Sequence, residues 1–182
     1  MKLYVIFDYK EKYPALSGRL LTDELIRECL GREDIVIERT DRGKPYIAST
    51  DFAGCCISVS HSGGTFALLV SDRNVGLDIQ YRRDVKADRI AARCFPEEEA
   101  FYVAEEAAGG RFFTLWTRKE AYSKYTGLGM EQIMKKEPVP DSCEVQFTDF
   151  RLEDGCYCSI CSGRTGEEGG QEPDEIQISY RK

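Results

Sequence analysis

Residues 76–80 read Gly-Leu-Asp-Ile-Gln, an alternation of apolar and polar side chains that is typical of a short β-strand. Successive side chains of a strand point to opposite faces, so Leu77 and Ile79 enter a core while Asp78 and Gln80 share the other face. A carboxylate and an amide oxygen side by side are the beginning of a site for a hard cation such as Mg²⁺. Such a site needs at least one more carboxylate from elsewhere in the chain.

A later stretch offers that carboxylate. Residues 112–124 have helical periodicity, with Phe113, Trp116, Glu120 and Lys124 at positions i, i+3, i+7 and i+11 of one face. Glu120 would add a carboxylate to the site, and Lys124 a positive charge. Each piece alone also fits a simpler interpretation, a solvated Asp78 and an i,i+4 Glu–Lys pair, because charged residues are mostly exposed.

Size and charge exclude several classes of protein. The chain has 182 residues, enough for one domain or two small ones, and its formal net charge of −7 argues against a nucleic-acid coat or a general membrane-surface binder. No stretch approaches the ~20 apolar residues of a membrane span, and the apolar run at 3–7 is too short for a signal peptide. We therefore expect a cytoplasmic protein with neither nucleic acid nor membrane among its partners.

Eight cysteines are present, and three of them form the pattern Cys156-x-Cys158-x-x-Cys161. This spacing allows a zinc site, but no second ligand cluster follows and His61 is the only histidine. We favour the interpretation that these cysteines are small buried hydrophobic residues of a strand. His61 stands at the end of a predicted hairpin, where a lone histidine is more often structural than functional.

The predicted elements mix hairpins with helices, which indicates an α+β fold and not a doubly wound parallel sheet. Strands are expected at 3–7, 35–38, 44–47, 57–61, 65–70, 75–80, 145–152, 156–161 and 176–180, and helices at 19–30, 82–93, 96–108 and from 112 to about 127. The acidic, glycine-rich residues 166–175 are expected to form a mobile loop.

Five short motifs follow one another along the chain. They are Gly43-Lys44-Pro45, Ser58-Val59-Ser60-His61-Ser62, Val75-Gly76-Leu77-Asp78-Ile79, Phe95-x-x-x-Glu99 and Trp116-Thr117-x-Lys119-Glu120-Ala121-x-x-Lys124. Each is weak alone, but in this order and spacing the chain resembles the 4′-phosphopantetheinyl transferase superfamily, in particular its surfactin-synthetase-activating type. The resemblance extends from about Arg19 to Tyr180.

The resemblance implies a fold, a reaction and partners. The fold would be two pseudo-symmetric α+β halves, residues 1–73 and 74–182, each a small mainly antiparallel sheet packed with helices, with a coenzyme A cleft between them. The enzyme, of the holo-[acyl-carrier-protein] synthase type, would use Mg²⁺ to transfer phosphopantetheine from coenzyme A to a serine of an apo acyl or peptidyl carrier protein. It would release adenosine 3′,5′-bisphosphate, act as a monomer, and serve fatty acid or secondary metabolite biosynthesis.

Residue roles follow from the matching motif positions. The resemblance implies metal ligands at Asp78, Gln80 and Glu120, and catalytic roles for Glu120, Lys124 and Glu99, with Glu120 the first candidate base and Glu99 the second. It implies contacts to coenzyme A at Arg19, Lys44, Ser60, His61, Lys119 and Lys124.

Gln80 departs from the family pattern, because many relatives have glutamate there. Glutamine keeps an oxygen but removes a charge, so the metal would be held by two carboxylates together with water and phosphate oxygens. Two alternatives follow: a catalytically weak paralogue that binds coenzyme A or carrier protein without transfer, and an unrelated Mg²⁺ phosphohydrolase that uses water in place of the serine.

A basic stripe is predicted on the helix after the metal strand. Arg82, Lys86, Arg89 and Arg93 fall at i, i+4, i+7 and i+11, although the chain as a whole is acidic. One interpretation is a dock for an acidic carrier protein, which arginines on the corresponding helix of shorter family members support by resemblance. The other is a solvated helix face, partly neutralised by the nearby acidic residues.

Overall fold

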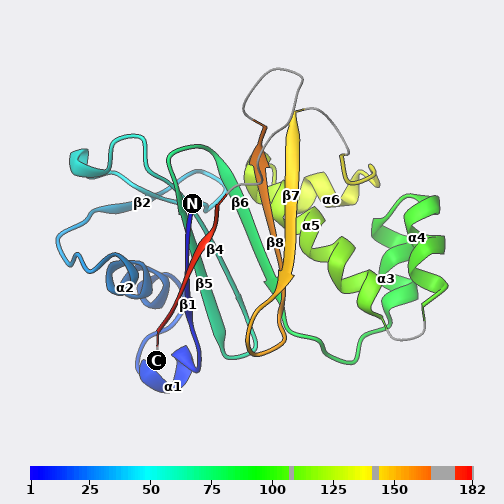
Figure 1. Ribbon diagram of the computed structural model, residues 1–182, viewed down its shortest axis with the longest axis horizontal. Helices are drawn as coiled ribbons and strands as arrows, with labels where there is room; N and C mark the ends of the chain where they lie inside the picture. Colours follow the sequence, from blue (N-terminus) through cyan, green and yellow to red (C-terminus); the bar gives the residue numbers. More distant parts are fainter. Residues whose placement is uncertain (107–108, 141–143, 165–174, 182) are drawn as a thin grey trace.

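Two small β-sheets lie against each other in the middle of the protein, and helices cover their outer faces (Figure 1). The computed structural model describes residues 1–106, 109–140, 144–164 and 175–181, so the loop predicted at 166–175 falls outside the described residues except for Glu175. The elements are β1 (Lys2–Ile6), α1 (Tyr9–Lys12), α2 (Gly18–Leu30), β2 (Ile37–Arg39), β3 (Pro45–Ile47), the 3₁₀ turn η1 (Thr50–Phe52), β4 (Cys56–Ser62), β5 (Thr65–Ser71), β6 (Val75–Gln80), α3 (Ala87–Cys94), α4 (Glu97–Ala104), α5 (Gly110–Thr126), α6 (Met130–Met134), β7 (Val145–Arg151), β8 (Tyr157–Gly163) and β9 (Gln177–Arg181).

The strands form sheets that are mainly antiparallel. One sheet has four strands in the order β4-β5-β1-β9, another has three in the order β6-β8-β7, and β2 pairs with β3 in a small ribbon. Only the β1–β9 pairing among these described strands is parallel. The α+β fold with small antiparallel sheets packed with helices is therefore confirmed.

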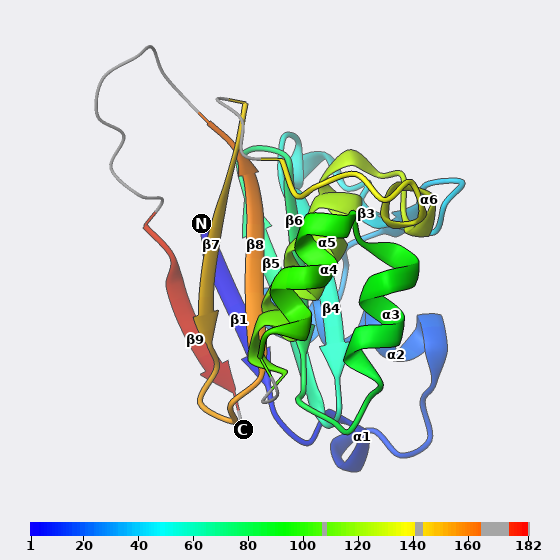
Figure 2. The ribbon, with the colours of Figure 1, turned by 90° about the vertical axis from the view of Figure 1, so that its right-hand side faces the viewer.

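The position of strand β1 between two hydrophobic cores explains why its sequence is almost continuously apolar. Leu3 and Val5 face the three-stranded sheet and share a core with Leu77 and Ile79 of β6. The alternate residues of β1 face the other way, into a second core beneath α2. Both faces of the central strand are therefore buried, and the layers run from α2 through the two sheets to α5 (Figures 1 and 2).

Helix α5 packs directly on the three-stranded sheet. Asp78 of β6 and Ser159 of β8 are register partners on the face that α5 covers. The Lys124 ammonium lies 2.7 Å from Asp78 Oδ1, and Thr117 Oγ1 lies 2.7 Å from Ser159 Oγ. These polar contacts fix the rotation of α5 about its axis, since a buried polar group is costly unless it is paired.

The helix predicted at 82–93 is wrong in its first half. Residues 81–86 are not helical, and α3 begins only at Ala87. Helices in proteins are stabilised mainly by packing of an apolar face, and residues 82–86 contain a single apolar side chain, Val85. Arg89 and Arg93 therefore lie on α3, while Arg82 and Lys86 precede it in a segment that is neither helix nor strand. A single basic helical stripe does not form.

Other elements differ from expectation in smaller ways. Helix α4 ends at Ala104 instead of near 108, and the short elements α1, η1 and α6 were not predicted from periodicity. The final strand is present, but it pairs with β1 in parallel and so joins the sheet built from the N-terminal residues. Short elements of three to five residues carry too little pattern to be identified from one sequence.

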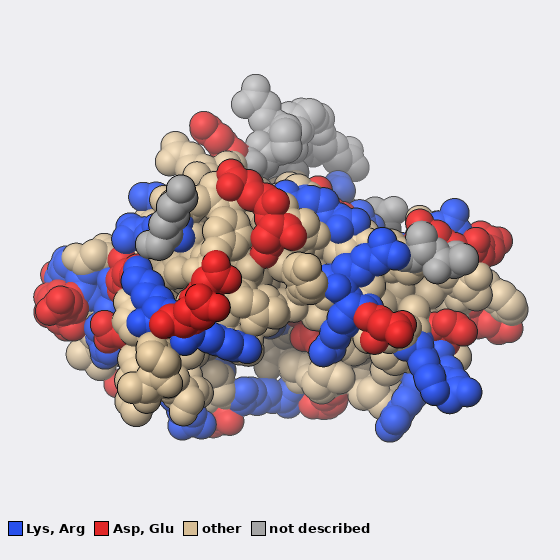
Figure 3. Space-filling view, turned by 90° about the horizontal axis from the view of Figure 1, so that it is seen from below, with Lys and Arg blue, Asp and Glu red and all other residues tan. Residues whose placement is uncertain are grey.

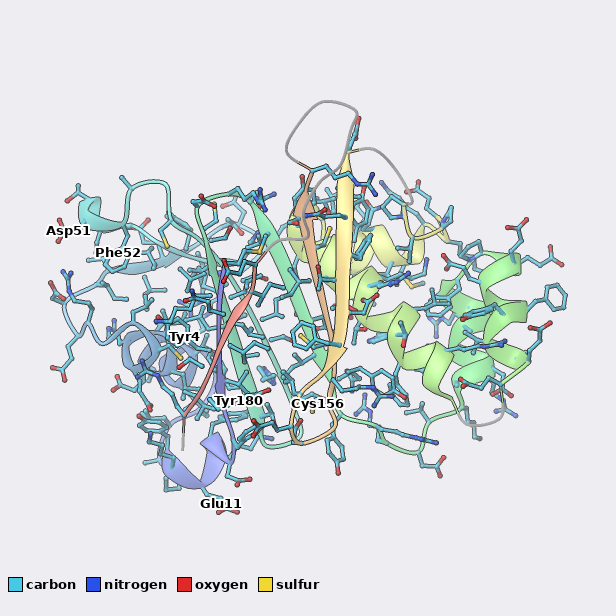
Figure 4. The ribbon with its side chains drawn as sticks, in the orientation of Figure 1. Tyr4, Glu11, Asp51, Phe52, Cys156 and Tyr180 are labelled. Atoms are coloured by element: carbon cyan, nitrogen blue, oxygen red, sulfur yellow. The ribbon has the colours of Figure 1, made fainter. Side chains whose placement is uncertain are left out.

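The cysteines of β8 and its preceding turn are hydrophobic residues of the core. Cys156, Cys158 and Cys161 are all buried, and Cys156 lies beside the turn of the β7–β8 hairpin in the middle of the molecule (Figure 4). Burial raises the pKa of both the Cys156 and Cys161 thiols to about 12, so they are protonated at neutral pH. Within the described ranges no group of three or more His, Cys, Asp or Glu side chains is arranged to hold a metal, and no helix is long and apolar enough to cross a membrane.

Candidate functional site

A cavity of about 550 Å³ contains the residues that the sequence predicted for a metal site. Six elements line it: α2, β2, β3 and β4 from the N-terminal part of the chain, and β6 and α5 from the rest. Its lining residues are Gly18, Arg19, Thr22, Arg39, Gly43, Pro45, Val59, Ser60, His61, Asp78, Ile79, Gln80, Trp116, Glu120 and Lys124. We call it the central cavity.

Three of the four residues predicted on one face of α5 line the central cavity, and the fourth, Phe113, is buried in a hydrophobic core. Trp116, Glu120 and Lys124 all line the central cavity from α5, opposite Asp78 and Gln80 of β6. The i, i+4 and i+8 spacing along the helix stacks these three side chains on one side. One strand and one helix, distant in the sequence, therefore place two carboxylates, an amide and an ammonium group around a common space.

Asp78 is buried, and its two oxygens have different surroundings. Oδ1 accepts hydrogen bonds from Ser60 Oγ and from Lys124 Nζ, both at 2.7 Å. Oδ2 is buried, and in the described part of the chain it has no hydrogen-bond partner. A buried carboxylate oxygen without a partner is costly unless a ligand binds it.

Glu120 is the second carboxylate of the cavity. Burial raises its pKa, the neighbouring negative charge of Asp78 raises it further, and Lys124 opposes the shift. Among the described residues its carboxylate has no hydrogen-bond or ion-pair partner. It is therefore a base of increased proton affinity that faces an open space.

His61 and Arg19 lie at the N-terminal side of the cavity. Partial burial lowers the pKa of His61, the positive charges of Lys124 and Lys10 lower it further, and Asp78 has a smaller opposite effect. The unliganded imidazole is thus neutral at neutral pH. A bound anion would reverse this balance, because negative charge favours the imidazolium form.

Comparison with known proteins identifies the family. The family model described as "4'-phosphopantetheinyl transferase superfamily" matches residues 74–159, and the model described as "4'-phosphopantetheinyl transferase, N-terminal" matches residues 4–74. The chain is 32% identical over 176 residues to the 4'-phosphopantetheinyl transferase gsp of Aneurinibacillus migulanus, an alignment that covers 84% of this chain and 70% of that protein. The chain belongs to the 4′-phosphopantetheinyl transferase superfamily.

Two further relatives of the phosphopantetheinyl transferase family match a smaller part. The 4'-phosphopantetheinyl transferase psf-1 of Bacillus pumilus is 32% identical over 120 residues, covering 63% of this chain and 50% of that protein. The 4'-phosphopantetheinyl transferase Sfp of Bacillus subtilis is 28% identical over 120 residues, covering 61% and 52%. The chain thus spans about half the length of these two relatives, and its family is one of transferase enzymes.

Lys44 was expected to contact coenzyme A, but it does not line the central cavity. Its ammonium donates to the carbonyl oxygen of Lys124 at 2.8 Å and lies 3.4 Å from the carbonyl oxygen of Val75. Burial lowers the pKa of Lys44, with a further contribution from the charge of Lys124. In this structure Lys44 joins the loop before β3 to the C-terminal end of α5.

Glu99 and Lys119, predicted as a catalytic and a coenzyme A residue, also lie outside the lining of the cavity. They form an ion pair of 2.7 Å in which Lys119 is buried. Lys119 also donates to the carbonyl oxygen of Glu137, and Glu99 accepts from the backbone N–H of Val139. Lys119 precedes Glu120 by one position on the helix, so the two cannot share a face. This spacing argues against a common role of Lys119 and Glu120 in one site.

A second and larger hollow, of about 820 Å³, lies beside the segment after β6. Arg82 lines it, with other charged residues of both signs, but none of the carboxylates or lysines of the central cavity does. All four predicted partner-binding residues, Arg82, Lys86, Arg89 and Arg93, are exposed. On the face seen in Figure 3, Lys and Arg side chains lie at both ends of the molecule, interspersed with acidic ones.

Two polar side chains of the cavity, those of Thr22 and Arg39, have no role in the sequence-based assignment. Thr22 lies one turn after Gly18 on α2, and Arg39 of β2 forms an ion pair of 2.5 Å with Asp23. Their positions depend on how α2 and β2 approach β6, and the periodicity of a single helix or strand does not predict that approach.

Proposed function

We propose that this protein transfers 4′-phosphopantetheine from coenzyme A to a serine of an apo carrier protein in a Mg²⁺-dependent reaction. The observation that carries the proposal is the convergence of Asp78, Glu120 and Lys124 on one cavity. Family membership supports the same chemistry, because the relatives carry the name 4'-phosphopantetheinyl transferase. The central cavity is the proposed coenzyme A site, with Arg19 and His61 as contacts to its phosphates.

The residues of the cavity fit a divalent cation. Asp78 Oδ2 has no hydrogen-bond partner among the described residues, the Glu120 carboxylate faces the same space, and Gln80 adds an amide oxygen on the same strand face. Oxygen donors of this kind suit Mg²⁺. When bound, Mg²⁺ would neutralise charge on the pyrophosphate oxygens of coenzyme A. Asp78, Glu120 and Gln80 are the residues proposed to hold it.

The proposed transfer is a displacement at phosphorus. The carrier serine oxygen bonds to the β-phosphorus of coenzyme A, and the bond between that phosphorus and the bridging oxygen breaks. The bridging oxygen leaves with adenosine 3′,5′-bisphosphate, and Glu120 takes the serine proton. Lys124 places a positive charge beside the oxygens on which negative charge increases. Glu99 is a poorer base because Lys119 pairs with it.

We propose that an acidic acyl or peptidyl carrier protein binds to a surface formed by the exposed residues Arg82, Lys86, Arg89 and Arg93. Arg82 follows the metal strand by two positions, so a carrier held there would lie close to the cavity that contains Gln80. Complementary charge would raise the rate of association more than the final affinity.

The test is an intact-mass assay. The protein is incubated with coenzyme A, Mg²⁺ and an apo acyl or peptidyl carrier, and the expected result is a carrier heavier by one phosphopantetheine group. A carrier whose acceptor serine is replaced by alanine is the matched control. Coenzyme A cleavage in the absence of carrier would instead indicate a phosphohydrolase. Binding of coenzyme A without any mass change would indicate a non-catalytic paralogue.

A further inference from the structure

Strands β4 and β6 lie side by side although they belong to different sheets. Three serines of β4, at alternate positions, join them. Ser58 Oγ accepts the backbone N–H of Leu77 at 2.9 Å, Ser60 Oγ accepts that of Ile79 at 3.1 Å, and Ser62 Oγ accepts that of Tyr81 at 2.8 Å. We call Ser58, Ser60 and Ser62 the serine row. The period of two on both strands keeps every member of the row on one face.

Ser60 differs from the other two members of the serine row. Its hydroxyl also donates to Asp78 Oδ1 at 2.7 Å, and both residues are only 6% exposed. A serine hydroxyl has one proton, and here that proton is committed to Asp78. Ser60 therefore has no donor left for a phosphate of coenzyme A, which is the role that its sequence motif suggested.

The Ser60 hydrogen bond affects how the Asp78 carboxylate is presented. Oδ1 receives two donors, one from Ser60 on β4 and one from Lys124 on α5. Two donors on the same oxygen restrict rotation of the carboxylate and leave Oδ2 as the oxygen without a partner in the described chain. Hydrogen bonds to a ligating carboxylate hold it in the orientation that a metal requires.

We propose that Ser60 is a positioning residue for Asp78. Its hydrogen bond from strand β4 orients the Asp78 carboxylate on β6 so that Oδ2 is available to the cation. The proposal rests on the proposed function. It replaces a direct contact between Ser60 and coenzyme A, and it links the metal-binding carboxylate to a strand from the other part of the chain.

The test compares Ser60→Ala with Ser58→Ala, which loses the same kind of N–H acceptor but touches no carboxylate of the cavity. Mg²⁺ alone is titrated into each protein by calorimetry, and steady-state transfer is measured with varied coenzyme A. For Ser60→Ala we expect an about tenfold or larger loss of Mg²⁺ affinity and a similar fall in kcat. We expect Ser58→Ala to match the wild type in both, and KM for coenzyme A to stay unchanged in both variants.

A second variant, Ser60→Cys, keeps the side-chain size and a weak donor, so a folded protein changed at this position is available if Ser60→Ala unfolds. It should fall between the wild type and Ser60→Ala in Mg²⁺ affinity. Equal Mg²⁺ affinity and kcat in the Ser58 and Ser60 variants would overturn the proposal, as would a rise in KM for coenzyme A with kcat unchanged. A wild-type protein that binds Mg²⁺ but modifies no carrier would contradict the proposed function instead.

Discussion

Gly76 of β6 lies so close to Ala121 of α5 that a Cβ atom on residue 76 would be 1.9 Å from the carbonyl oxygen of Ala121. The same Cβ would be 2.7 Å from the backbone nitrogen of Tyr125. Both obstacles are backbone atoms, which cannot turn away as a side chain can. This close approach brings Glu120 and Lys124 over Asp78, two positions along the strand and on the same face.

Gly76→Ala should therefore separate α5 from β6. Overpacking of this kind costs on the order of 1–3 kcal/mol or more, because the helix must move as a whole. We expect a lower denaturation midpoint and a large loss of carrier modification. Gly110→Ala is the control, since a Cβ there meets the flexible side chain of Glu106 and the Tyr157 hydroxyl at 3.3 Å. Equal stability of the two variants would contradict the packing argument.

Glu120 and Glu99 should respond differently to replacement by glutamine. Glu120→Gln removes the base of the central cavity, and a loss of kcat on the order of 100-fold is expected with little change in stability. Glu99→Gln leaves the buried ammonium of Lys119 without its charged partner, which should lower the free energy of unfolding by on the order of 3 kcal/mol. Its loss of activity should be much smaller than that of Glu120→Gln. Chemical denaturation and the carrier mass assay measure both effects. A folded Glu120→Gln protein with normal turnover would remove Glu120 from the mechanism.

Coenzyme A binding should take up a proton at His61. Burial and neighbouring positive charges lower the pKa of the free imidazole, and a bound phosphate would raise it. Affinity should then increase as the pH falls below neutrality, because the neutral imidazole of the free protein must gain a proton on binding. Calorimetry in two buffers of different ionisation enthalpy counts the protons, and His61→Ala should show less uptake. The assignment fails if the two proteins take up the same number.

Reversal of Arg82 and Arg89 to glutamate should raise KM for the carrier and leave KM for coenzyme A almost unchanged. Both residues are exposed, so the effect should act on association and weaken as salt screens it. Lys2 and Arg27, reversed together, provide a control with the same change in net charge on the other part of the molecule. If the control alters carrier kinetics as much as the test variant, the dock lies elsewhere.

Periodicity allowed much of this fold to be predicted. Strand β6 and helix α5 have clear periods of two and 3.6, so the shared face of Asp78 and Gln80 and that of Glu120 and Lys124 were predictable from single elements. The helix predicted at 19–30 ends at its predicted residue, where Gly31 follows with φ 65°, a conformation that glycine adopts readily. The helix start after β6 was not predictable from charge spacing, since charged residues at helical intervals do not supply an apolar face.

The sequence by itself determined the local elements and the chemical groups each one presents, because side-chain order along a strand or helix sets which residues share a face. Tertiary structure decided which of those groups meet. Lys44, Lys119 and Glu99 carry suitable charges, yet backbone carbonyls and an ion pair outside the central cavity occupy them. Ser60 was assigned to a ligand by its motif, but the approach of β4 to β6 commits its proton to Asp78. The reason is physical: a hydrogen bond requires two groups within about 3 Å, and only the packing of distant segments sets that distance.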